Sequence, residues 1–205
     1  MAKTITLTGT PANPQDAATK GYVDTQIAIY DGTMTAVDHG ALAWTSDPQI
    51  TTNMTPIIGS VYATVFRAAA SGTCGKMVMQ CVTLQTTPTD IRVGLFDLSG
   101  NLLATSANVN VSFQTTGTKT IALGNTVALV AGAKYVAALL VVGGTAPTVT
   151  ATVGSSQPAL NQTLSNTTPL RQMKTSVATR TAFTNPEVWT GYAVVGQAPL
   201  ALMVV

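Results

Sequence analysis

From about Thr33 to its end, the chain repeats one pattern: short apolar runs separated by clusters of Gly, Pro, Asn and Thr, with no helical period. Runs of this length predict β-strands. Threonine occupies 36 positions while charged residues make up only 9%, so hydroxyl side chains must cover much of the solvent face of the sheets. We therefore predict a mainly β fold, a jelly-roll-like antiparallel β-sandwich over residues 33–205. Strands are expected at 57–68, 76–86, 90–98, 101–106, 108–113, 118–123, 126–130, 134–142, 147–153, 171–183, 187–195 and 200–205.

Two stretches predict particular features of this sandwich. In "VGLFDLSGNLLATS" the residues Ser99, Gly100 and Asn101 tolerate a tight turn, so a hairpin is expected there. In "PTVTATV", at 147–153, apolar residues alternate with threonines, which indicates a strand with one buried face and one wet face.

Two further runs are apolar on both faces. "YVAALLVV", at 135–142, fits a central strand covered by a second sheet or by a neighbouring subunit. The last residues, "LALMVV", have the same character, and an exposed edge strand of this kind would invite aggregation. We therefore expect the last strand to be buried in an oligomer.

The first 32 residues follow a different pattern. "ITLTG" suggests a short strand, and the prolines of "TPANPQ" suggest an extended connector. Asp16 is a suitable N-cap for a helix from about residue 17 to 30, in which Val23, Ile27 and Tyr30 form a narrow apolar stripe. A helix this short is marginal in water by itself, so the stripe must pack on the rest of the chain or on other copies of it.

The segment "P…DAATKGYVD", within residues 11–27, resembles a motif found near the N-termini or necks of bacteriophage fibre and other virion appendage proteins. The remainder of the chain matches no family known to us. The resemblance implies that residues 1–32 attach to another virion protein and gather three chains, with Asp16, Val23, Ile27 and Tyr30 as the trimerisation and attachment residues. It also implies that residues 33–205 project outward as a head.

The resulting expectation is a homotrimeric structural virion protein, a tail or head fibre or a spike, whose head contacts a glycan or protein of the host surface. The alternative is a capsid decoration protein, or a collar or adaptor protein, with a purely structural role. In either case the protein is expected in the virion, after synthesis in the host cytoplasm. The chain starts without the apolar run of a secretory signal, in agreement with this expectation.

Charge and hydropathy argue against two classes of partner. The net charge of +2 lacks the basic cluster that nucleic-acid binding requires. The longest strongly apolar run, at 136–142, is far shorter than the roughly 20 residues of a membrane-spanning helix. We expect neither nucleic-acid binding nor membrane insertion.

The chain offers little for catalysis or for holding a cofactor. Asp90 and Asp97 flank one predicted strand at turn-like positions, which favours structural roles. His39 is the only histidine and lies in a predicted loop. On one extended strand, Cys74 and Cys81 would be far apart and on opposite faces, so they are expected to be buried free thiols rather than a disulfide or zinc ligands. We predict no enzymatic activity, no cofactor and no metal.

Stacking of sugars on aromatic rings is the remaining way to bind a ligand. Trp44, Trp189 and Tyr192 are the candidate receptor contacts, and "NPEVWTGY", at 185–192, is the best candidate loop. The alternative for each ring is a place in the core or in a contact between subunits.

Overall fold

The computed structural model describes residues 35–45, 51–87, 89–152, 172–195, 197–199 and 201–204. The chain divides into two units, Met1–Thr35 and Ala36–Val205. Asp16, Val23, Ile27 and Tyr30, together with the predicted helix, lie outside the described residues. Their attachment and trimerisation roles stay predictions.

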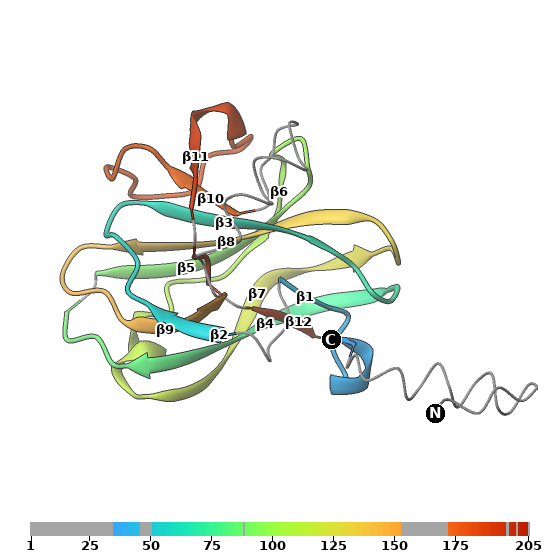
Figure 1. The fold of residues 1–205 in the computed structure, drawn as a ribbon, viewed down its shortest axis with the longest axis horizontal. Coiled ribbons are helices and arrows are strands. Elements are labelled where there is room, and N and C mark those ends of the chain that lie inside the picture. Colours follow the sequence, from blue (N-terminus) through green and yellow to red (C-terminus); the bar gives the residue numbers. More distant parts are fainter. Residues whose placement is uncertain are drawn as a thin grey trace, which may run out of the picture. The chain divides into compact units, whose positions relative to one another are not determined.

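Two antiparallel sheets make up the second unit (Figure 1). Sheet A contains β1 (Ala43–Trp44), β12 (Leu202–Val204), β4 (Gly72–Thr83), β9 (Thr148–Thr152) and β2 (Thr51–Met54) in this order, and β7 (Gly117–Leu129) also pairs with β4. Sheet B contains β11 (Tyr192–Val194), β10 (Gln172–Thr175), β3 (Val61–Arg67), β8 (Lys134–Val142), β5 (Asp90–Phe96) and β6 (Leu102–Thr105). The described residues also form three short 3-10 turns, η1 (Val37–His39), η2 (Asn110–Gln114) and η3 (Trp189–Gly191).

The strands from β2 to β9 form a jelly roll. One sheet runs β2-β9-β4-β7 and the other β3-β8-β5-β6, so early and late strands of the chain alternate as neighbours. This is the arrangement expected of two Greek keys folded into a double-layered sandwich. The prediction of a mainly β, jelly-roll-like sandwich is confirmed. β1 and β12 extend sheet A, and β10 and β11 extend sheet B.

Strand β8 is central and buried on both faces, as its sequence predicts. It lies between β3 and β5, and Leu139 and Val141 on one face belong to the cluster between the two sheets. Val136 and Leu140, on the other face, are covered by a later segment of the same chain. A second sheet and the chain's own C-terminal region therefore cover β8.

The last strand is covered by pairing within a single chain, whereas we expected an oligomer to cover it. β12 is inserted between β1 and β4, with Met203 opposite Ala43 on one side and Met77 on the other. Met203 is fully buried. The sequence shows that this strand must be covered, but the partner strands are distant in the chain and could not be identified from it.

The hairpin of β5 and β6 has the predicted turn. Gly100 has a φ of +90°, a left-handed value that glycine adopts without strain. The carboxylate of Asp97 accepts hydrogen bonds from the backbone and side-chain amides of Asn101, at 2.9 and 2.7 Å. These bonds close the turn that leads into β6.

Some predicted strands differ from the observed ones. The segment predicted as a strand at 108–113 contains η2, because the Asn108 side chain accepts hydrogen bonds from the amides of Ile91 and Asn110 and favours a local turn. The two strands predicted at 118–130 are one strand, β7, which continues through a bulge opposite Gly75. β1 and β2 are not among the predicted strands, and the long strands expected at 171–183 and 187–195 shorten to β10 and β11.

Candidate functional site

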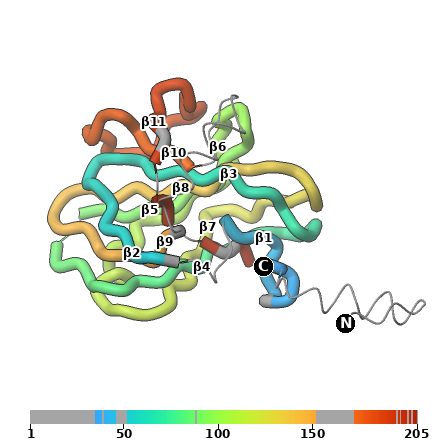
Figure 2. Tube along the Cα trace, viewed as in Figure 1, coloured from blue at the N-terminus to red at the C-terminus, as the bar shows by residue number. Residues whose placement is uncertain are grey.

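Residues 172–195 contain β10 and β11 at one end of sheet B, and their Trp189 and Tyr192 pack with side chains from the outer face of β3, β8 and β5. We call this segment the C-terminal cap. β10 pairs with β3, with Met173 opposite Ala63, and β11 pairs with β10. Figures 1 and 2 show β10 and β11 on the far side of β3 from β4 and β12. The cap contains two of the three aromatic residues that we predicted as receptor contacts.

Trp189 and Tyr192 are buried in the cap, with 6% and 8% of their surface exposed. Their rings meet edge to face, with centroids 5.2 Å apart, and Trp189 meets Phe96 of β5 in the same way at 5.5 Å. The indole Nε1 of Trp189 donates a hydrogen bond to the carbonyl oxygen of Leu98 at 3.1 Å. Both rings are therefore core residues, and our expectation that they offer a stacking face to a sugar is corrected.

Trp44, the third candidate, lies on β1 of sheet A and is half-buried. Trp189 and Tyr192 belong to the cluster on the outer face of sheet B, which does not include it. The three predicted contacts therefore do not form one binding site.

Glu187, the only glutamate of the chain, lies at the centre of the cap with a fully buried side chain. Arg180 Nη2 lies 2.5 Å from Glu187 Oε2 and forms an ion pair with it. The amide of Thr184 donates to Oε1 at 2.7 Å, and the Tyr192 hydroxyl donates to Oε2 at 3.1 Å. Both oxygens of this carboxylate therefore accept hydrogen bonds, which offset the free-energy cost of removing the charge from water.

These groups, Arg180, Thr184, Glu187 and Tyr192, form what we call the polar latch. The latch is absent from the sequence-based predictions, although one signal was present: a single glutamate stands in the aromatic stretch "NPEVWTGY". Removing one partner of a buried ion pair typically lowers the free energy of unfolding by about 3 to 5 kcal/mol, because the other charge remains buried without a partner. The latch therefore fixes the conformation of the cap.

Burial raises the pKa of Tyr192 well above its usual range, and the nearby carboxylate of Glu187 raises it further. A phenolate at this position would have to be desolvated beside an existing negative charge. Tyr192 therefore acts in the latch as a neutral hydrogen-bond donor.

This pKa predicts that the protein is less stable at alkaline pH. Because the folded state holds the Tyr192 proton more tightly than the unfolded state, the stabilisation is complete below the unfolded pKa of about 10 and is lost as pH rises above it. Urea denaturation at increasing pH measures the slope of the free energy of unfolding against pH. Tyr192→Phe should reduce the alkaline loss, while Tyr135→Phe, outside the cap, should retain it. Equal slopes in all three proteins would contradict the prediction.

Backbone hydrogen bonds join the cap to two turns of the jelly roll. The amide of Glu187 donates to the carbonyl oxygen of Gly100 at 2.8 Å, and the amide of Leu102 donates to the side chain of Asn185 at 3.0 Å. The amide of Arg180 donates to the carbonyl oxygen of Gly59 at 2.8 Å. The cap is thus positioned by the β5–β6 turn and by the loop before β3.

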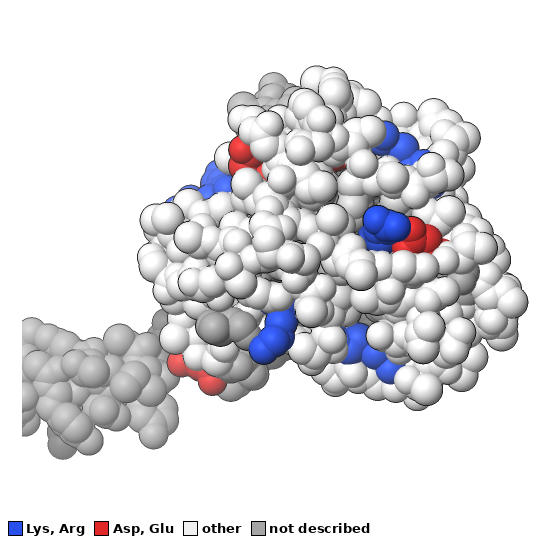
Figure 3. All heavy atoms as spheres, turned by 180° about the vertical axis from the view of Figure 1, so that it is seen from behind, with Lys and Arg blue, Asp and Glu red and all other residues white. Residues whose placement is uncertain are grey.

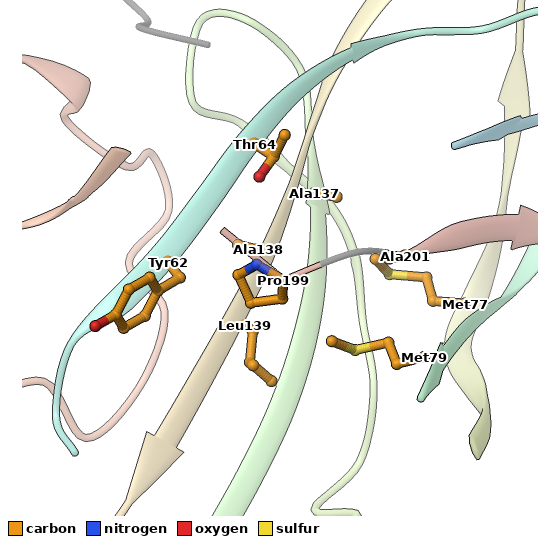
Figure 4. A pocket seen from close by; sticks show the side chains of 9 residues that line it. All are labelled: Tyr62, Thr64, Met77, Met79, Ala137, Ala138, Leu139, Pro199 and Ala201. Carbon is orange, nitrogen blue, oxygen red and sulfur yellow. The ribbon is translucent and has the colours of Figure 1, made fainter. Parts of the chain in front are cut away.

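A small pocket lies between the sheets (Figure 4). Its lining consists of Tyr62, Thr64, Met77, Met79, Ala137, Ala138, Leu139, Pro199 and Ala201. The cavity volume is about 10 Å³, which is room for about one water molecule and far below the 300 to 1,000 Å³ typical of ligand sites. Tyr62 directs its hydroxyl to the amide of Ile57, which donates to it at 3.2 Å. The pocket therefore provides a small apolar space with few polar groups.

The acidic residues of β5 have local partners. Asp90 forms an ion pair with Arg92 at 2.7 Å, and Asp97 closes the turn between β5 and β6. Within the described ranges, no group of three His, Cys, Asp or Glu residues could hold a metal ion. His39 belongs to η1, and its side chain lies outside what the structure describes.

Cys74 and Cys81 are free and fully buried, as predicted, but they do not lie on opposite faces of β4. The register of β4 with β7 shifts between Cys74 and Lys76, and at this irregularity β4 departs from strict alternation, so both thiols belong to the cluster between the sheets. Such a bulge cannot be inferred from residue spacing, which assumes strict alternation.

We expect both thiols to be unreactive in the folded protein. Burial raises the pKa of Cys74 and of Cys81, so at neutral pH each is a protonated thiol without access to reagent. Titration with a chromogenic disulfide reagent should detect no thiol in buffer and two in denaturant. Rapid reaction of either cysteine in buffer would contradict the buried placement.

The surface carries few charges, and those visible are scattered over a largely uncharged face (Figure 3). On the cap, Val177 and Val188 are exposed at 61% and 64% beside threonines and Asn185. A ligand of this region would meet uncharged side chains and short aliphatic groups. No helix of the described ranges has the length and hydropathy of a membrane span.

Comparison with protein-family models and with curated proteins finds no match to this chain. The function must therefore be inferred from the fold, from the chemistry of the side chains and from the motif at residues 11–27.

Proposed function

We propose that the protein is a structural virion protein, a homotrimeric phage fibre or spike with an outward β-sandwich head that contacts the host surface. The observation that carries the proposal is the "DAATKGYVD" motif at residues 16–24, which precedes a jelly-roll domain. Residues 1–32 attach the protein to another virion component and gather three chains. Residues 33–205 form the head.

The support for three chains comes from the N-terminal stripe. The head buries its apolar strands within one chain, including β8 and β12, so it supplies no reason for association. Val23, Ile27 and Tyr30, by contrast, form an apolar stripe on a predicted helix too short to be stable by itself. Three such helices around an axis would cover one another's stripes.

The proposal includes a head without catalytic activity. Asp90, Asp97 and Glu187 each form hydrogen bonds or ion pairs that hold a turn, a strand or the cap in place. Glycoside hydrolysis would need two acids facing one substrate, one of them with a raised pKa. The net charge is only +2, and the face in Figure 3 carries scattered charges, so nucleic-acid binding is not part of the proposal, nor is membrane insertion or a cofactor.

A second candidate is a capsid decoration or collar protein with a purely structural role. The burial of Trp189 and Tyr192 favours it, because the cap then lacks the aromatic platform that a sugar-binding head commonly uses. The small size of the pocket between the sheets points the same way.

Electron cryo-microscopy of particles with and without the gene would test the proposal. We expect the deletion to remove threefold density that projects from a fibre or spike position, and to reduce adsorption to host cells. Loss of density lying flat on the capsid, with normal adsorption and a lower resistance to heat or osmotic shock, would support the decoration role instead. Unchanged particles would contradict both.

A further inference from the structure

The described head has two separate hydrophobic clusters rather than one. The first lies between sheets A and B, and the second lies between the cap and the outer face of β3, β8 and β5. The second cluster contains Val61, Ala63, Phe96, Val136, Ala138, Leu140, Met173, Trp189 and Tyr192. Sheet B separates the two clusters, so the contacts between the sheets do not depend on the cap.

The cap also has its own polar framework. The latch joins Arg180, Glu187 and Tyr192 within the cap, without a side chain of the jelly roll. Outside the sheet pairing, two backbone hydrogen bonds join the cap to the turns that contain Gly59 and Gly100. Three further bonds use side chains of the cap: Thr175, Asn185 and Trp189 bond to the backbone of Val61, Leu102 and Leu98. β10 meets β3 over only three residue pairs, at the end of the β3-β8-β5-β6 order.

We propose that residues 172–195 form a detachable cap, which separates from β3, β8 and β5 as a unit while the jelly roll stays folded, and that the polar latch holds it closed. Regions that have a hydrophobic cluster and a polar framework of their own can open below the global free energy of unfolding. The groups that face the Glu187 carboxylate are Arg180, Tyr192 and the amide of Thr184, all of the cap. The neighbouring β5–β6 turn carries Asp97, whose carboxylate is bonded to Asn101.

Opening would expose a continuous apolar face of sheet B. Val136, Ala138 and Leu140 of β8 would lose their cover, together with Phe96 of β5. A face of this kind binds hydrophobic dyes and tends to associate. The inference goes beyond the proposed function, because it concerns the head of a single chain whatever its role.

Hydrogen exchange of the full-length protein at neutral pH, read by mass spectrometry, tests the inference. We expect Glu187→Gln to speed exchange of the amides of residues 172–195 by about tenfold to a hundredfold, because the charge of Arg180 loses its partner. The amides of β4 and β7 should be unchanged, and binding of a hydrophobic dye should rise. Asp90→Asn, which breaks the ion pair with Arg92, is the matched control and should leave the cap unchanged.

Two results would overturn the inference. One is equal acceleration in the cap and in β4 and β7, which would mean that the head opens as a single unit. The other is an unchanged cap in Glu187→Gln. Should this variant fail to fold, the wild-type protein gives the same test at low urea: cap amides should exchange together, before those of β4 and β7, whereas simultaneous exchange would contradict the proposal.

Discussion

Gly100→Ala should lower the free energy of unfolding by about 4 kcal/mol. About 1 to 2 kcal/mol is the cost of a left-handed φ for an L-residue, and the remainder is overpacking where the cap meets the β5–β6 turn. A Cβ at this position would lie 2.0 Å from the carbonyl oxygen of Glu187, and backbone atoms must shift to admit it. Urea denaturation measures the loss.

Gly117→Ala is the matched control for this variant. Gly117 has a φ of +103°, similar to that of Gly100, but a Cβ there would meet nothing within 4 Å. We expect it to cost only the backbone strain, about 1 to 2 kcal/mol. The difference between the two losses in free energy of unfolding measures the overpacking between position 100 and the backbone of Glu187. Equal losses would mean that the close contact of Glu187 with Gly100 contributes nothing to stability.

The double variant Val23→Asp/Ile27→Asp should convert the proposed trimer into a monomer. Six carboxylates would then replace the apolar stripe at the proposed threefold contact, where desolvated like charges are strongly unfavourable. Sedimentation velocity measures the change. Circular dichroism should still show the β-sandwich, because the head buries its own strands.

Thr25→Asp adds a carboxylate on the opposite side of the predicted helix and is the control for this pair. We expect it to retain the oligomer. A loss of association in Thr25→Asp as large as in the double variant would show that the stripe is not the contact.

The sequence predicts correctly those strands and turns that are determined by residues adjacent in the chain. The alternation around Val149 and Ala151 predicts one buried face, and both side chains are buried in β9. Gly100 predicts the β5–β6 turn because few residues adopt its φ. The run at 135–142 predicts a strand covered on both faces, which is β8.

Features that depend on distant residues could not be predicted. The partner strands of β12 are more than a hundred residues away in the chain. The apolar character of β12 therefore indicated that it is buried but did not identify the strands that cover it. The buried state of Trp189 depends on Phe96 and on the carbonyl of Leu98, which belong to another hairpin. The shared face of Cys74 and Cys81 depends on a bulge that strict alternation does not include.

The proposed fibre or spike depends above all on the association of three chains, and the mass of the full-length protein in dilute solution is the decisive test of that association. Light scattering coupled to size exclusion should give three times 21.0 kDa, or about 63 kDa, unchanged on tenfold dilution. A single species of 21.0 kDa would contradict the trimer and the fibre proposed from it.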